Sequence, residues 1–215
     1  MLVAESNLRG SIPSEIACLT KLTRLRLDNN VLFGSIPSAA TNDKTNPMLG
    51  LPQLTKLEVL DLHNNALSGV VFAGQENDIS MSFFQNLSNL RTIYLHGNRE
   101  LSGVIPSSIH YATNLINLSL MGCSFVGTLP QTIGELSSLE FLQLHDNLLR
   151  GTIPSSILEL SELSFISLGQ NQFNGTIPEF GSREQPNLYM IGLSLNQLTG
   201  SIPASTSSLS KLEVR

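Results

Sequence analysis

Charged residues are scarce in this chain. Only 13% of its 215 residues are Asp, Glu, Lys or Arg, roughly half the share that is usual in globular domains. Acidic residues outnumber basic ones, 17 to 12, which gives a net charge of −5. This balance does not suit nucleic acid, since binding to phosphates depends on Lys and Arg. The polar surface must consist largely of Ser, Thr, Asn and Gln, which is compatible with extracellular recognition.

Long apolar runs are also missing. No stretch of about 18 apolar residues occurs, so the sequence predicts no transmembrane segment. The start does not resemble a signal peptide, because Met1, Leu2 and Val3 are followed at once by Glu5 and Asn7. Secretion or membrane anchoring is therefore not predicted from these two features.

A repeated pattern dominates the rest of the sequence. Its clearest copy is the segment LEFLQLHDNLLRGTIP from Leu139 to Pro154, which can be written L-x-x-L-x-L-x-x-N-x-L-x-G-x-I-P. The next copy begins at Leu163, and 24 residues separate Asn147 from Asn171. A fixed period of this length indicates a solenoid, in which each coil packs only against its neighbours.

Each coil is expected to contain a short strand. In Leu142-Gln143-Leu144 the apolar residues alternate with a polar one, which is the period of a strand with one buried face. Stacking aligns these strands as one parallel sheet on the concave side and buries the leucines continuously. Gly151 is expected to allow a close turn, and the return segment, residues 155–162, forms the convex side.

The asparagine of each copy is predicted to form a ladder through the stack. Its amide can bond the backbone of its own turn and of the neighbouring coil where no water reaches. An unmatched buried partner would cost about 1–3 kcal/mol. The ladder positions are Asn30, Asn65, Asn98, Cys123, Asn147, Asn171 and Asn196.

The L-x-G-x-I-P tail of these copies resembles the plant-type leucine-rich repeat. The resemblance covers nearly all of residues 1–215 and implies a single α/β leucine-rich-repeat solenoid. It would be a right-handed superhelix of about eight coils, with a parallel concave β-sheet and 3-10 or irregular convex segments. Similar repeats occur in the ectodomains of receptor-like kinases and receptor-like proteins. They also occur in polygalacturonase-inhibiting proteins. In those families the concave and side surfaces recognise peptides, proteins or glycans.

Several features depart from a regular, complete array. Insertions near residues 38–48 and 73–81 lengthen two coils. They are interpreted either as two neighbouring loops that together bind a ligand or as surface loops without a role in binding. Both ends of the sequence cut through a coil, which predicts a domain truncated at both ends. The resemblance implies paired cysteines in terminal caps, but Cys18 and Cys123 lie about four coils apart and cannot form such a pair.

Outward-facing side chains on the concave sheet are the predicted ligand-binding residues. They stand two, four or six places before each ladder position, and neighbouring coils align them in columns. In one column Phe141, Phe165 and Met190 form an apolar strip. The strip either contacts a partner or packs under neighbouring loops, and the sequence does not decide between these two interpretations. The candidate residues are Arg24, Arg26, Asp61, His63, Tyr94, His96, Met121, Phe141, Gln143, His145, Phe165 and Met190.

Three of the four histidines fall in one column. His63 and His96 are predicted to lie on neighbouring rungs, with Asp61 one column away, which suggests either metal binding or a pH-dependent contact. A zinc site needs three or four convergent ligands, whereas a flat sheet spreads its side chains. No metal site and no cofactor is therefore predicted, and ordinary solvated polar positions remain the alternative to pH-dependent binding.

An enzyme is not predicted. Asp61, His63 and nearby serines resemble a hydrolytic triad in composition, but no serine lies on a strained elbow turn and no Gly-rich phosphate loop occurs. Three glycosylation sequons begin at Asn86, Asn117 and Asn174, and they favour secretion weakly because a chain rich in Asn, Ser and Thr forms such triplets by chance.

These observations predict a non-catalytic module that binds a protein, peptide or glycan ligand. The leading hypothesis is the ectodomain part of a receptor-like protein, glycosylated, acting in signal transduction outside the cell or at its surface. In that case any membrane anchor belongs to the full protein. The alternatives are a secreted inhibitor of the polygalacturonase-inhibitor type and an intracellular leucine-rich-repeat scaffold.

Overall fold

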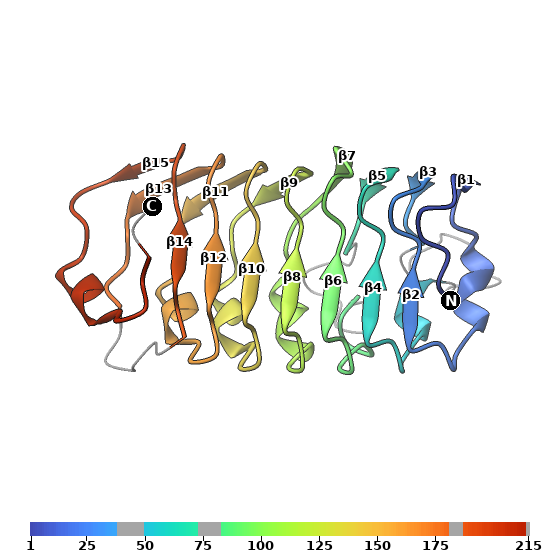
Figure 1. Cartoon of the computed structure of the whole chain (residues 1–215), viewed down its shortest axis with the longest axis horizontal. Coiled ribbons are helices and arrows are strands. Elements are labelled where there is room, and N and C mark those ends of the chain that lie inside the picture. The colour runs from blue at the N-terminus through green and yellow to red at the C-terminus, as the bar shows by residue number, and fades with distance from the viewer. Residues whose placement is uncertain (38–49, 73–82, 181–186, 214–215) are drawn as a thin grey trace.

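The computed structural model describes residues 1–37, 50–72, 83–180 and 187–213. Both predicted insertions, near residues 38–48 and 73–81, therefore lie outside the described residues. The rest forms an elongated stack of coils, with the two termini near opposite ends of the stack (Figure 1). This arrangement confirms the predicted solenoid.

A seven-stranded parallel sheet runs along one side of the stack. Each strand is three residues long and belongs to the strand position predicted from the repeat. In most strands the central side chain points into the core, as Leu142 does between Phe141 and Gln143. The strands are β2 (Arg24–Arg26), β4 (Val59–Asp61), β6 (Thr92–Tyr94), β8 (Asn117–Ser119), β10 (Phe141–Gln143), β12 (Phe165–Ser167) and β14 (Met190–Gly192).

A second parallel sheet, of eight strands, was not predicted from the sequence. It is built from the L-x-G segments that follow the ladder positions. Its strands are β1 (Arg9–Gly10), β3 (Val31–Ser35), β5 (Ala66–Val70), β7 (Glu100–Gly103), β9 (Ser124–Gly127), β11 (Leu148–Thr152), β13 (Gln172–Thr176) and β15 (Gln197–Thr199).

The glycine of the repeat lies inside this second sheet, so the expectation of a close turn at Gly151 is wrong. Gly151 belongs to β11 and has a φ of +80°, which is strained for residues with a side chain. A Cβ at this position would lie 2.8 Å from Cγ2 of Thr128 in the preceding coil. The glycine therefore serves both the backbone conformation and the close approach of neighbouring coils.

Short 3-10 helices form the convex side of the stack. They begin after a proline in most coils; Pro154, for example, precedes η6 with an extended backbone, and its ring fixes φ. No helix in the described part of the chain has the length and apolar character needed to cross a bilayer. The helices are η1 (Ser14–Cys18), η2 (Leu51–Gln53), η4 (Ser107–Tyr111), η5 (Gln131–Glu135), η6 (Ser155–Glu159) and η7 (Ala204–Ser208).

One continuous hydrophobic core extends from Ile12 to Leu209 between the two sheets and the 3-10 helices. Each coil contributes leucines from its strand and an isoleucine or leucine from its convex segment. The core is therefore assembled by stacking, because no single coil encloses its own apolar side chains.

The ladder asparagines bond their own coil and the one before it. Nδ2 of Asn147 donates to the carbonyl oxygens of Leu144 and Leu120, at 3.1 and 2.9 Å, and Oδ1 accepts from the amide of Phe125 at 2.9 Å. Asn98 is 0% exposed and has the same arrangement. Corresponding bonds to the preceding coil are present at Asn30, Asn65, Asn171 and Asn196.

Cys123 occupies the ladder position that follows Asn98, whose own coil has one extra residue before Leu101. Its Sγ donates to the carbonyl of Leu95 at 3.4 Å. In the preceding coil, the amide of Leu101 donates to the carbonyl of Asn98 at 3.0 Å. The backbone carbonyl of Asn98 thus accepts the hydrogen bond that an asparagine Oδ1 accepts at the other ladder positions.

Candidate functional site

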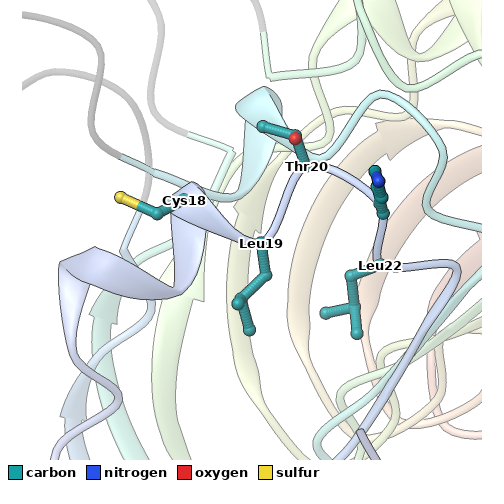
Figure 2. Close-up of a pocket in the computed structure, with 5 residues that line it drawn as sticks. Cys18, Leu19, Thr20 and Leu22 are labelled. Carbon is teal, nitrogen blue, oxygen red and sulfur yellow. The ribbon is translucent and has the colours of Figure 1, made fainter.

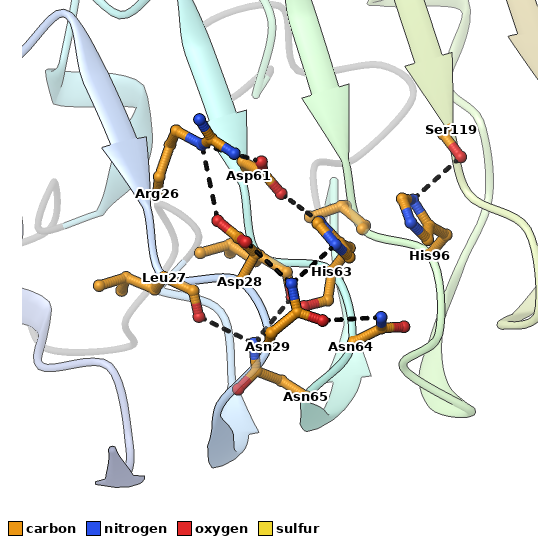
Figure 3. A network of polar contacts seen from close by, with 12 residues as sticks. Arg26, Leu27, Asp28, Asn29, Asp61, His63, Asn64, Asn65, His96 and Ser119 are labelled. Carbon is orange, nitrogen blue, oxygen red and sulfur yellow. Dashed lines mark hydrogen bonds and ion pairs between the residues drawn. The ribbon is translucent and has the colours of Figure 1, made fainter. Parts of the chain in front are cut away.

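The β2 end of the seven-stranded sheet carries a network of charged and polar side chains (Figure 3). Nε of Arg26 lies 3.2 Å from Oδ2 of Asp61, and the other oxygen of Asp61 lies 2.6 Å from Nδ1 of His63. Nδ2 of Asn29 lies 3.2 Å from Nε2 of His63 and donates to Oδ2 of Asp28 at 3.0 Å. The network therefore joins side chains from two neighbouring coils.

Asp61 stands in its predicted column of the sheet, but the prediction that it is exposed to solvent is wrong. Asp61 and Asp28 are each 2% exposed. Arg26, half of whose side chain is exposed, forms an ion pair with both carboxylates, and His63 contacts Asp61. A buried carboxylate requires such partners, since desolvating an unpaired charge is unfavourable.

His63 and His96 lie side by side, as the repeat spacing predicts. Their rings stack with centroids 4.4 Å apart and planes inclined by 16°. Burial lowers the pKa of His96 and the adjacent His63 lowers it further, whereas Asp61 raises it and His145 lowers it. These effects together favour the neutral form of His96.

Tyr94 packs edge-on against both rings of this pair. Its centroid lies 6.5 Å from that of His63 and 5.8 Å from that of His96. Burial raises the pKa of Tyr94 and the Asp61 carboxylate raises it further, whereas Arg26 lowers it. The phenol is therefore a neutral hydrogen-bonding group on this surface.

The pairing of Asp61 with His63 does not extend to Ser119. Oγ of Ser119 lies 3.1 Å from Nδ1 of His96, and Ser119 is only 1% exposed. Figure 3 shows this contact beyond the Asp61–His63 pair, with Ser119 on β8, the second strand after β4. The arrangement does not place this serine as a nucleophile beside the pair.

An apolar strip lies toward the other end of the same sheet. The strand register aligns Phe141 with Phe165, and Phe165 with Met190. All three side chains are half-buried, so each leaves part of its apolar surface exposed. The ring centroid of Phe165 also lies 6.0 Å from that of Tyr189.

The remaining candidates lie between these two regions or at the sheet edge. Gln143 aligns with Ser119 and Ser167. Nδ1 of His145 lies 3.0 Å from Oγ of Ser167. Met121 and His145 are half-buried in the turns that follow their strands, and Arg24 is exposed on β2. The structure thus brings all the predicted ligand-binding residues to one sheet or to the turns directly after its strands.

A separate open cavity of about 470 Å³ lies at the first coil, beside η1. Figure 2 shows Leu19 and Leu22 on the same side of the chain, with Cys18 directed away from them. All the lining residues belong to the segment from Cys18 to Leu22. None of these lining residues belongs to the polar network, and we assign the cavity no ligand.

Comparison with known proteins identifies the repeat. A family model described as "Leucine Rich Repeat" matches residues 56–74, 89–112 and 138–160. The crystal structure of PEPR1–AtPEP1 has a TM-score of 0.83 and 34% identity over 98% of this chain and 26% of that chain. This chain is a plant-type leucine-rich-repeat domain.

Two further relatives of this leucine-rich-repeat domain are receptor kinases of Arabidopsis. The receptor-like kinase TMK2 of Arabidopsis thaliana is 29% identical over 127 residues, which are 58% of this chain and 12% of the kinase. The structure of HAESA with the peptide hormone IDA and the co-receptor SERK1 has a TM-score of 0.82 and 29% identity, over 97% of this chain and 31% of that chain. The domain thus resembles receptor-kinase ectodomains and spans under a third of these relatives.

The predicted glycosylation sites differ in accessibility within the leucine-rich-repeat domain. Asn86 and Asn174 are exposed. Asn117 is half-buried in β8, where the register pairs it with Thr92 and Phe141 on the seven-stranded sheet. Glycosylation at these positions stays a prediction.

Asp28 is the site residue that sequence reasoning left out of the candidate set. It stands two places before Asn30, in the same column as His63, and that shared column was the available signal. Its burial, and its ion pair with Arg26, depend on side-chain conformations that the repeat pattern does not determine.

Proposed function

We propose that this leucine-rich-repeat domain is part of the ectodomain of a receptor-like protein, outside the cell or at its surface, and binds an extended peptide across its seven-stranded sheet. HAESA, a similar ectodomain, was crystallised with a peptide hormone and a co-receptor. The proposal transfers peptide binding, and no particular peptide, to this chain.

The apolar strip is the observation that carries the proposal. Phe141, Phe165 and Met190 stand in register on three consecutive strands and are only half-buried. Aromatic and methionine side chains aligned on a rigid sheet offer contact area at a low cost in conformational entropy. Apolar side chains of a bound peptide would complete their burial.

The dimensions of the sheet suit a short peptide. Seven parallel strands spaced by ~4.8 Å extend over about 29 Å. An extended chain rises about 3.3 Å per residue, so a peptide that crosses all seven strands needs about nine residues.

The distribution of charged and apolar side chains on the sheet favours one arrangement of the peptide's own polar and apolar residues. Arg24 is exposed on β2, whereas Arg26 is already engaged by two carboxylates. A matching peptide therefore places a polar or acidic group at the β2 end and apolar residues over Phe165 and Met190, at the β14 end.

The test is selection of nonapeptides from a random phage-displayed library against the whole chain, followed by affinity measurements on variants. Phe141→Ala and Phe165→Ala should each weaken binding of the selected peptides by at least tenfold. Phe33→Ala is the matched control, because Phe33 is an aromatic residue that is 49% exposed on the second sheet. Its loss should leave the affinity unchanged.

Two results would contradict the proposal. One is selection that enriches no peptide with a dissociation constant below about 100 µM. The other is a set of peptides whose affinity falls for Phe33→Ala and not for Phe141→Ala or Phe165→Ala. Circular dichroism of each variant confirms that the array is folded.

A further inference from the structure

One carboxylate oxygen at the β2 end of the seven-stranded sheet lacks a hydrogen bond. Of the buried side-chain oxygen and nitrogen atoms in the described residues, one has no hydrogen-bond partner. It is Oδ1 of Asp28. Nε of Arg26 lies 3.6 Å away, which is an ion-pair distance and too long for a hydrogen bond. Buried oxygens of this kind normally have a partner, so the atom requires an explanation.

Two other metal-ligating groups lie close to the Asp28 carboxylate. Asp28, Asp61 and His63 each offer one ligand atom, and these atoms lie within 4.8 Å of one another. Both aspartates are 2% exposed, and 18% of the His63 side chain is exposed. The sheet therefore does not spread these side chains, contrary to what its flat geometry predicts.

The charges of the cluster are not balanced by Arg26 alone. Two buried carboxylates share a single guanidinium group, and the imidazole of His63 accepts from Asn29 at one nitrogen while facing Asp61 at the other. A neutral His63 leaves one negative charge without a cation. A divalent cation would remove this excess and satisfy the free oxygen of Asp28.

We propose that Asp28, Asp61 and His63 form a zinc-binding site. Two carboxylate oxygens and one imidazole nitrogen match a three-ligand zinc site, with a fourth position left for water or a ligand group. The nitrogen ligand favours zinc over calcium and magnesium, which prefer oxygen ligands alone. The proposal does not depend on peptide binding by the strip at the other end of the sheet.

Three local changes accompany zinc binding. Arg26, with 47% of its side chain exposed, turns toward solvent and vacates the space between the two carboxylates. Coordination by Nδ1 of His63 replaces its contact with Asp61 and moves the ring proton to Nε2. A turned Asn29 amide then presents its oxygen to that proton, so the site binds the ion without losing a proton from the neutral ring.

Isothermal titration of the whole chain with zinc chloride tests the site. The measurement uses the Cys18→Ser background, because Cys18 is exposed and its thiol is itself a zinc ligand. We expect one zinc per chain with a dissociation constant below about 10 µM. Asp28→Asn and His63→Gln should each weaken binding at least tenfold, and millimolar calcium should not compete.

Two further variants separate this site from other zinc ligands. Arg26→Met removes the competing guanidinium and should tighten binding several-fold, which also serves as the decisive readout if Asp28→Asn does not fold. His145→Gln is the matched control, since His145 lies in the same column but pairs with Ser167. Absent binding, weaker binding by Arg26→Met, or equal losses in His145→Gln and His63→Gln would overturn the proposal.

Discussion

Nε of Arg26 lies 3.2 Å from Oδ2 of Asp61, and this contact links the first two strands of the seven-stranded sheet by an ion pair. The aspartate is buried, whereas the arginine is half exposed. The pair therefore joins a desolvated carboxylate to a guanidinium on a partly solvated side chain. This asymmetry determines how the two residues respond to substitution.

Arg26→Ala should lower the free energy of unfolding by about 1–2 kcal/mol in metal-free buffer, because it removes the cation from two buried carboxylates. Arg24→Ala is the matched control on the same strand, and its effect should stay within about 0.5 kcal/mol. Urea denaturation followed by circular dichroism measures both. Equal effects of the two substitutions would show that the buried carboxylates do not depend on Arg26.

Asn98→Ala should destabilise the array by about 3 kcal/mol or more. The side chain is 0% exposed and forms hydrogen bonds with the backbone of Leu62, Leu95 and Leu67, so its removal leaves buried groups unpaired. Asn114 also bonds an adjacent coil, through the carbonyl of Ser88, but in an exposed position. Asn114→Ala should cost less than about 1 kcal/mol, and a comparable loss in the two variants would argue against the buried ladder as a major source of stability.

Leu195→Asn should stabilise the array by about 1 kcal/mol. Leu195 has a φ of +55°, in the left-handed region that asparagine tolerates better than leucine, and its side chain is 72% exposed. Asn29 and Asn64 stand at the equivalent position of other coils with φ near +52°. Leu148→Asn, on an exposed strand position, is the control and should not raise the melting temperature. A lower melting temperature for Leu195→Asn would contradict this explanation.

Cys123 should resist alkylation until the solution is strongly alkaline. Burial raises the pKa of the Cys123 thiol to about 11, so the reactive thiolate is rare at neutral pH. Because the folded state raises this pKa above its ordinary value, the neutral thiol contributes stability below pH about 9, and this contribution is lost as the pH rises through about 11.

Mass spectrometry after iodoacetamide treatment checks the order of reaction. At pH 8 the exposed Cys18 should be modified while Cys123 stays free, and urea should abolish the difference. Modification of both thiols at the same rate in the folded chain would mean that the ladder position of Cys123 opens to solvent.

The repeat pattern was sufficient to predict the solenoid, the strands of the seven-stranded sheet and the adjacency of His63 and His96. These features depend on a fixed period, which can be counted in the sequence. The second sheet was missed, because Gly151 resembles a turn residue, and its pairing with Phe173 depends on the next coil.

The polar network shows a different limit. Columns of side chains follow from the repeat, but burial depends on the reach of individual side chains. Arg26 forms ion pairs with Asp28 and Asp61, and both aspartates, which stand in outward-facing columns, are buried. A pattern of residue positions contains no information on which rotamer a long side chain adopts.

The central claim is that the seven-stranded sheet is the recognition surface, and photo-crosslinking tests it most directly. A selected nonapeptide that carries benzophenone near its apolar end would be irradiated with the chain, and the attachment site mapped by mass spectrometry. We predict attachment at Met190, Phe165 or Phe141. Attachment to the exposed residues Val126 and Leu148 of the second sheet, or to no single site, would contradict the claim.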